Sequence, residues 1–132
     1  MNPYAAYKKQ SVTTMTPIEI VIKLYSETER ELNRSVVFIE EKDYEKANKA
    51  LSKSVDLISA LRSVLDVSLP IGKNLDSIYD FMTKQIIAAN LKKDTAIIKS
   101  VIPMVGELKD AFTQVGAMSK DEIAAQTLQS SK

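Results

Sequence analysis

The sequence predicts an all-α fold, an antiparallel up-down four-helix bundle preceded by an aromatic arm. Apolar residues recur every three or four positions in four segments, short polar links with capping residues separate these segments, and no stretch shows the sustained alternation of a β-strand. With 132 residues, of which 45% are hydrophobic, the chain can bury the core of one domain. We expect an N-terminal arm over residues 1–15, the bundle over 16–116 and a C-terminal tail over 117–132.

The first helix has the clearest predicted start. Thr16 suits the capping position, Pro17 suits the first helical position, and Glu19 stands where a capping box requires an acidic residue. The residues that follow at spacings of three and four share one face of a helix, which we expect to be buried. They are Ile18, Val21, Tyr25, Thr28, Leu32, Ser35 and Ile39.

The other three helices are predicted by the same spacing. Asp43 and Asp94 are expected to cap the second and fourth helices. The pattern lapses over residues 66–74, which include Pro70 and Gly72, so the third helix is expected to begin after this segment. The expected core residues are Tyr44, Ala47, Leu51, Ser54, Ile58, Leu61 and Leu65, then Leu75, Tyr79, Met82, Ile86 and Ala89, then Ile98, Val101, Val105, Leu108, Phe112 and Val115.

Two features of the C-terminal third conflict with a simple helix. Pro103 removes a backbone hydrogen bond at a cost of roughly 3 kcal/mol, so a bend or break is expected near residues 99–103. In the tail, residues 119–122 form a weak capping box before Ile123 and Leu128. The tail is therefore expected either to form a short helix or to be disordered.

Composition argues against most catalytic and cofactor-binding roles. The chain has no histidine and no cysteine, so the commonest general base and the commonest metal ligands are missing, and three glycines do not make a phosphate-binding loop. We expect neither an enzyme nor a metal or cofactor site. The net charge of +1 argues against binding nucleic acid or anionic membranes. The sequence has neither a signal peptide nor a run of about 18 apolar residues, so a cytoplasmic protein without membrane insertion is expected.

The acidic residues Glu27, Glu29 and Glu31, and the pair Asp76 and Asp80, are interpreted as solvated helix faces, since no histidine completes a metal site. The tyrosines and the amide on the helices also have structural interpretations. Tyr25 and Tyr79 are expected in the core with satisfied hydroxyls, and Asn90 is expected to bond local backbone at a helix end.

The candidate binding residues are apolar side chains that fall outside the core pattern. Isolated exposed apolar residues are normal, but such residues also line grooves for an amphipathic helix or an extended peptide, and an aromatic arm can cover such a groove when it is empty. On the helices these residues are Ile20, Val37, Phe81 and Ile87, and the arm contributes Tyr4, Tyr7 and Val12.

A set of short motifs in order along residues 4–115 resembles one family. The motifs are Tyr4-Ala-Ala-Tyr7, Val12, Thr14-Met-Thr-Pro17, Leu24-Tyr25, the segment 50–61, Ile78-Tyr-Asp-Phe-Met82, Ala89-Asn90 and the segment 108–112. In this order they resemble the flagellin-specific export chaperones, the FliS family. The chain departs from the family pattern in the acidic stretch of residues 26–31, in Phe112 where a tryptophan is usual, and in Pro103.

The resemblance implies a cytoplasmic chaperone that binds the disordered C-terminal segment of flagellin in surface grooves, blocks premature polymerisation and keeps flagellin competent for export. Carried over from the family, Tyr7 is the first candidate for client contact, with Tyr4 and Val12 behind it. Together with Ile20, Phe81 and Ile87 from the helices, these are the expected partner-binding residues. The alternative is a helical adaptor of the flagellar system with another client, such as an anti-sigma factor or an export-gate component.

Overall fold

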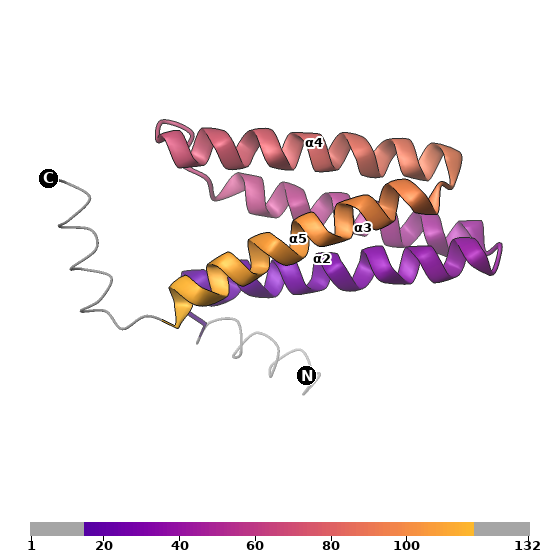
Figure 1. The fold of residues 1–132 in the computed structure, drawn as a ribbon, viewed down its shortest axis with the longest axis horizontal. Helices are drawn as coiled ribbons and strands as arrows, with labels where there is room; N and C mark the ends of the chain where they lie inside the picture. Colours follow the sequence, from indigo (N-terminus) through magenta and orange to yellow (C-terminus); the bar gives the residue numbers. More distant parts are fainter. Residues whose placement is uncertain (1–14, 118–132) are drawn as a thin grey trace, which may run out of the picture.

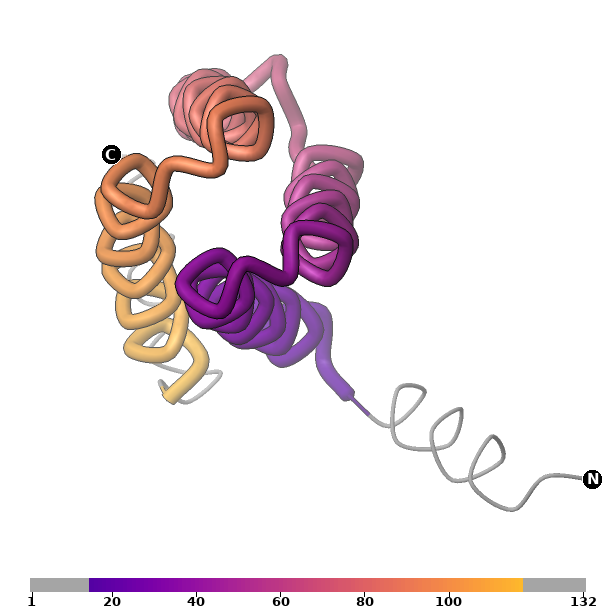
Figure 2. Tube along the Cα trace, turned by 90° about the vertical axis from the view of Figure 1, so that its right-hand side faces the viewer, coloured from indigo at the N-terminus to yellow at the C-terminus, as the bar shows by residue number. Residues whose placement is uncertain are grey.

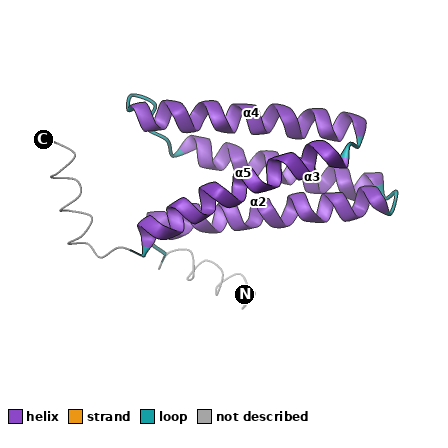
Figure 3. Ribbon diagram, viewed as in Figure 1, coloured by secondary structure: helices purple, strands orange, loops and turns teal. Residues whose placement is uncertain are grey.

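The four helices of the computed structural model lie side by side, and each runs antiparallel to the next (Figure 1). The structure describes residues 15–117. Its helices are α2 (Pro17–Glu40), α3 (Tyr44–Ser63), α4 (Pro70–Lys92) and α5 (Thr95–Gly116). Seen from one end they form a ring in the order α2, α3, α4, α5, and each helix packs against its two neighbours in the ring (Figure 2). Residues 15–117 contain helices and short links without a strand, which confirms the predicted all-α four-helix bundle (Figure 3).

The predicted helix starts are confirmed by capping hydrogen bonds. The side-chain oxygens of Thr16, Asp43 and Asp94 each accept a hydrogen bond from a backbone N–H two or three residues further on. These bonds satisfy donors that have no partner within the first turn of a helix. Short polar side chains therefore decide where three of the four described helices begin.

Helix α4 begins earlier than predicted, at Pro70 instead of after Asn74. A proline in the first turn loses no hydrogen bond, so Pro70 begins the helix where the sequence pattern suggested a link. Gly72 then lets the link from α3 pass close to this first turn. A Cβ atom at Gly72 would lie 1.9 Å from the carbonyl oxygen of Asp66, which is a forbidden contact.

The predicted core is largely confirmed, and it closes around two buried tyrosines. The Tyr25 and Tyr79 hydroxyls hydrogen-bond to each other in the interior. Tyr44 and Val115 were wrongly expected in the core, since their side chains are 48% and 43% exposed. They lie in the first turn of α3 and the last turn of α5, where neighbouring helices cover less surface. The large fully buried side chains include Tyr25, Leu32, Leu51, Ile58, Leu61, Tyr79, Met82, Ile86, Ile98, Val101 and Val105.

Two of the acidic side chains interpreted as solvated are paired instead. Glu31 is 2% exposed, and its carboxylate lies 3.0 Å from Arg34 and 3.6 Å from Lys53 of α3. Glu29 pairs with Lys109 of α5 at 2.5 Å, which raises the pKa of that lysine. A buried carboxylate requires cationic partners, so the acidic stretch holds α2 against both of its neighbours.

Helix α5 is continuous through Pro103. Of the bend or break expected near residues 99–103, the break is therefore absent. Val101 and Val105 on either side of the proline are both buried, and Pro103 itself is exposed. Packing of the flanking valines holds the helix together across the missing hydrogen bond.

Candidate protein-binding surfaces

The first candidate surface is a groove between α3 and α4 with a volume of about 500 Å³. Leu51 and Val55 of α3 and Ile86 of α4 contribute its apolar wall. Ile87 and Leu91, one turn apart on α4, extend along its rim and are 48% and 83% exposed. Apolar side chains this exposed at adjacent turns form a strip that no other described residue covers. We call this strip and the apolar wall beside it the α3–α4 groove.

The α3–α4 groove also has a polar lining, with Ser52 and Asp56 beside the apolar residues of α3 and amide groups at one end. Asn90 donates a hydrogen bond to the side-chain oxygen of Asn48 across the two helices, at 2.7 Å. The Lys93 ammonium donates to the side-chain and backbone oxygens of Asn90, at 2.6 and 2.7 Å. The expectation that Asn90 bonds local backbone was therefore wrong, because its amide bridges two helices. The bridge leaves amide and ammonium groups beside the apolar strip.

The second candidate surface lies at the end of the bundle where α2 begins and α5 ends. Figure 1 shows the α3–α4 link at this same end. A hollow of about 450 Å³ here is lined by the first turns of α2 and by Val64, and a second hollow of about 250 Å³ continues beneath the link. We call the two hollows the apolar end, since they are lined mainly by Pro17, Ile18, Ile20, Val21, Leu24, Val64, Leu65, Leu69, Ile71, Leu75, Tyr79 and Phe112.

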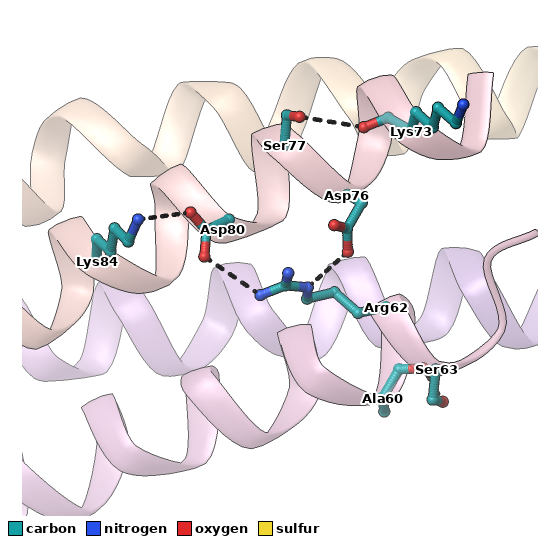
Figure 4. A network of polar contacts seen from close by, with 8 residues as sticks. All are labelled: Ala60, Arg62, Ser63, Lys73, Asp76, Ser77, Asp80 and Lys84. Atoms are coloured by element: carbon teal, nitrogen blue, oxygen red, sulfur yellow. Dashed lines mark hydrogen bonds and ion pairs between the residues drawn. The ribbon is translucent and has the colours of Figure 1, made fainter. Parts of the chain in front are cut away.

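An ion-pair network separates the two surfaces. Arg62 of α3 lies 2.8 Å from Asp76 and 3.6 Å from Asp80 of α4, and Asp80 also pairs with Lys84 (Figure 4). The hydrogen bond to Asp76 raises the pKa of Arg62, and the hydrogen bond from Lys84 lowers the pKa of Asp80. The two aspartates were interpreted as a solvated face, but they link α3 to α4. Asp80 lies on the same side of α4 as Ile87 and Leu91, so the network borders the α3–α4 groove.

The structure does not bring the predicted site residues together on one surface. Ile20 lines the apolar end and Ile87 lines the α3–α4 groove. Phe81 lines neither surface, because six positions along a helix turn it by about 240° from Ile87. Val37 also lies outside both surfaces. Tyr4, Tyr7 and Val12 lie outside the described residues, which begin one residue before the cap of α2.

Sequence reasoning missed several exposed apolar residues. Leu69 and Ile71 flank Pro70 in the segment interpreted as a link, and Val64 follows the last turn of α3. Leu91 lies four positions after Ile87 and therefore on the same face of α4. This helical spacing is the sequence signal by which Leu91 could have been predicted. For the segment 66–74 the only signal was its composition, since it contains three large apolar side chains, Val67, Leu69 and Ile71, where links are usually polar.

Within residues 15–117, no group of three acidic, histidine or cysteine side chains is arranged to hold a metal ion. In the same part of the chain, no helix combines the length and apolar character needed to cross a bilayer. The buried tyrosine pair offers no general base, because burial raises the pKa of both hydroxyls. Exposed apolar grooves of this kind fit protein partners.

The family model described as flagellar protein FliS matches residues 1–119. The chain belongs to the FliS family. Flagellar secretion chaperone FliS of Bacillus subtilis is 32% identical over 113 residues, covering 86% of this chain and 85% of the relative. The Vibrio cholerae protein of the same name is 34% identical over 116 residues, covering 83% and 85%. The Salmonella typhimurium protein of that name is 28% identical over 119 residues, covering 87% and 88%.

Membership of this family of flagellar export chaperones confirms the resemblance that the sequence motifs suggested. The relatives are named as chaperones, which is a non-enzymatic role. A chaperone of the flagellum implies a flagellar client protein.

Proposed function

We propose that this protein is a cytoplasmic chaperone that binds the disordered C-terminal segment of flagellin, blocks its premature polymerisation and keeps it competent for export. The observation that carries the proposal is the pair of apolar surfaces on one bundle, the apolar end and the α3–α4 groove. The two are separated along α3 and α4 by the Arg62 network. This arrangement suits a long segment that contacts the bundle more than once.

Energetics favour such a divided site for a disordered client. Ordering a segment on binding costs roughly 2–5 kcal/mol, and fully burying one large apolar side chain gains only about 1.5–3 kcal/mol. One groove with two exposed apolar residues therefore leaves little net affinity. Contacts at both surfaces offset the ordering cost, and the gain is spread along the client.

The shape and chemistry of the α3–α4 groove support a helical portion of the client there. Ile87 and Leu91 are spaced by one helical turn, as are the apolar residues of an amphipathic helix laid against them. The amide and ammonium groups of Asn48, Asn90 and Lys93 lie at one end. Groups of this kind bind the free carbonyls at the end of a helix.

The N-terminal arm joins the bundle at the apolar end, since Met15 directly precedes the cap of α2. We assign Tyr4, Tyr7 and Val12 to the edge of the client site on the strength of this connection and of the family motif. In this proposal the arm covers the apolar end until the client arrives. Tyr7→Ala then weakens client binding and leaves the helicity and melting temperature of the bundle nearly unchanged.

Binding of full-length flagellin by titration calorimetry tests the proposal, and circular dichroism follows the helicity that a C-terminal flagellin peptide gains. Ile87→Lys is expected to weaken binding at least about tenfold, because an isoleucine that the client covers on binding is replaced by a charge that must stay in water. Val37→Lys is the matched control, since Val37 is 49% exposed and lies outside both surfaces. Flagellin that fails to bind at micromolar concentration contradicts the proposal, and competition by an anti-sigma factor would identify the alternative client.

A further inference from the structure

The outer side of the α2–α3 pair carries a hollow of about 280 Å³ with a concentration of positive charge. Arg34 of α2 and three lysines of α3, Lys46, Lys49 and Lys53, line it. Glu31 supplies the single carboxylate in the lining. Two further carboxylates, those of Asp43 and Glu45, lie beside Lys46 and Lys49 outside the lining, so the hollow keeps an excess of cations over enclosed anions.

The charges in this hollow, which we call the basic hollow, are unequally satisfied. Glu31 is 2% exposed and takes Arg34 and Lys53 as partners. Lys46 lies 3.6 Å from the half-exposed carboxylate of Asp43, the cap of α3, and Lys49 lies 3.7 Å from the exposed carboxylate of Glu45; both distances are too long for hydrogen bonds. Exposed pairs of this kind contribute little energy, so both ammonium groups remain able to bind an anion.

An aromatic ring lies among these cations. The guanidinium of Arg34 lies 5.5 Å from the centre of the Phe38 ring, and the ammonium of Lys46 lies 5.9 Å from it. Phe38 is partly buried and lines the basic hollow beside Ala50. The site thus combines an apolar patch with cations on two sides, and it offers more than a row of solvated lysines.

We propose that the basic hollow is a docking site for an acidic peptide segment of a partner protein, whose carboxylates bind Lys46 and Lys49 and whose apolar side chain packs on Phe38. Charge complementarity carries this choice of occupant. A nucleic acid requires cations along an extended face, whereas these cations surround one small hollow with a phenyl ring in it. The site is separate from the proposed client surfaces, since it lies on the α2 side of α3 instead of the α4 side.

The probe for the test is a synthetic peptide in which aspartates and glutamates flank single leucines, with a matched peptide that carries asparagine and glutamine in their place. Both are titrated into the isotopically labelled full chain and followed by amide chemical shifts. The acidic peptide is expected to shift amides of residues 34–38 and 46–53, with an affinity that falls as salt rises. The neutral peptide is expected to leave them unchanged.

The variant Lys46→Glu with Lys49→Glu is expected to lower the affinity about tenfold, because it replaces two attractive charges by two repulsive ones. Its control is Lys23→Glu with Lys73→Glu, which reverses two exposed charges outside the hollow. Equal weakening by both variants, equal binding of the neutral peptide, or equal shifts with inorganic phosphate would each overturn the proposal. Because flagellin binding is measured separately with the Ile87 variant, failure here is distinguishable from failure of the proposed function.

Discussion

On its α2 side, helix α3 encloses a buried carboxylate with cations, whereas on its α4 side it leaves an apolar groove open to solvent. Glu31 has partners on both helices, so the charge joins them. Ile87 and Leu91 have no comparable cover within the described residues. The difference suggests that the closed side supports stability and the open side is kept for a partner. The predictions below test this division, from the largest effect to the smallest.

The largest effect is expected from Arg34→Ala combined with Lys53→Ala. The substitutions remove the two shortest ion pairs of Glu31 and leave its buried carboxylate with Arg30 alone, 3.8 Å away, which costs about 3 kcal/mol of the free energy of unfolding. Chemical denaturation measures this loss. Lys46→Ala with Lys49→Ala is the control on the same face, and it should cost less than about 1 kcal/mol because its ion pairs are exposed. Equal losses would show that burial of Glu31 is not what joins α2 to α3.

Gly72→Ala tests the close packing of the α3–α4 link against the first turn of α4. The new methyl group meets the Asp66 carbonyl oxygen and carbon at 1.9 and 2.7 Å, so the link or the first turn of α4 must move. Overpacking of this kind costs about 2 kcal/mol. The midpoint of thermal unfolding should fall accordingly. Gly106→Ala is the control and should not lower it, because the new Cβ would lie 3.4 Å from its nearest neighbour, a Glu29 carboxylate oxygen, and alanine favours a helix more than glycine does. A Gly72→Ala protein as stable as the parent would mean that the link yields freely.

The buried tyrosine pair predicts a loss of stability in alkali. Burial raises the pKa of Tyr25 and Tyr79 in the folded protein, so above about pH 10 the unfolded chain releases protons that the folded chain retains. Stability is therefore complete below pH 10 and falls as pH rises beyond it. Tyr25 alone contributes a loss of about 1 kcal/mol between pH 10 and pH 11. The Tyr25→Phe and Tyr79→Phe double variant should show a shallower decline when unfolding is measured across this range, and an unchanged slope would rule out the pair as its cause.

The smallest effect on stability is expected from Leu91→Lys on the open side. Leu91 is 83% exposed, so its substitution removes little buried surface and should change the free energy of unfolding by no more than about 0.5 kcal/mol. Denaturation and flagellin binding measured on one preparation separate the two roles. A large loss of stability would place Leu91 in the structural core and break the contrast between the two sides of α3.

The fold was predictable because its signals are local. Helix starts are marked by the capping residues Thr16, Asp43 and Asp94, whose hydrogen bonds span only two or three residues. The spacing of core positions such as Leu75 and Tyr79 follows from helix geometry. The start of α4 was predicted wrongly because the local signals at this point are misleading. Pro70 and Gly72 indicate a link in most contexts, and only the close passage of Asp66 explains why a glycine stands inside a helix.

The candidate surfaces were predictable only in part. Ile20 and Ile87 were found because each departs from the core spacing of its own helix, but Val64 and Ile71 meet other residues of the apolar end through folding of the link. Phe81 departs from the same spacing as Ile87 and lies on another side of α4. Periodicity identifies a side chain that does not face the core, and it does not say which neighbouring helix stands beside it.

By itself the sequence determined four amphipathic helices, their caps and the motifs of the FliS family, because these depend on residues close together in the chain. Tertiary structure decided which charges are buried and which apolar residues stay open. Glu31 and Asp80 belong to similar acidic patterns, yet one is enclosed by α3 and the other lies on a half-exposed edge. Burial depends on what packs opposite a residue, and that is set by contacts between helices distant in sequence.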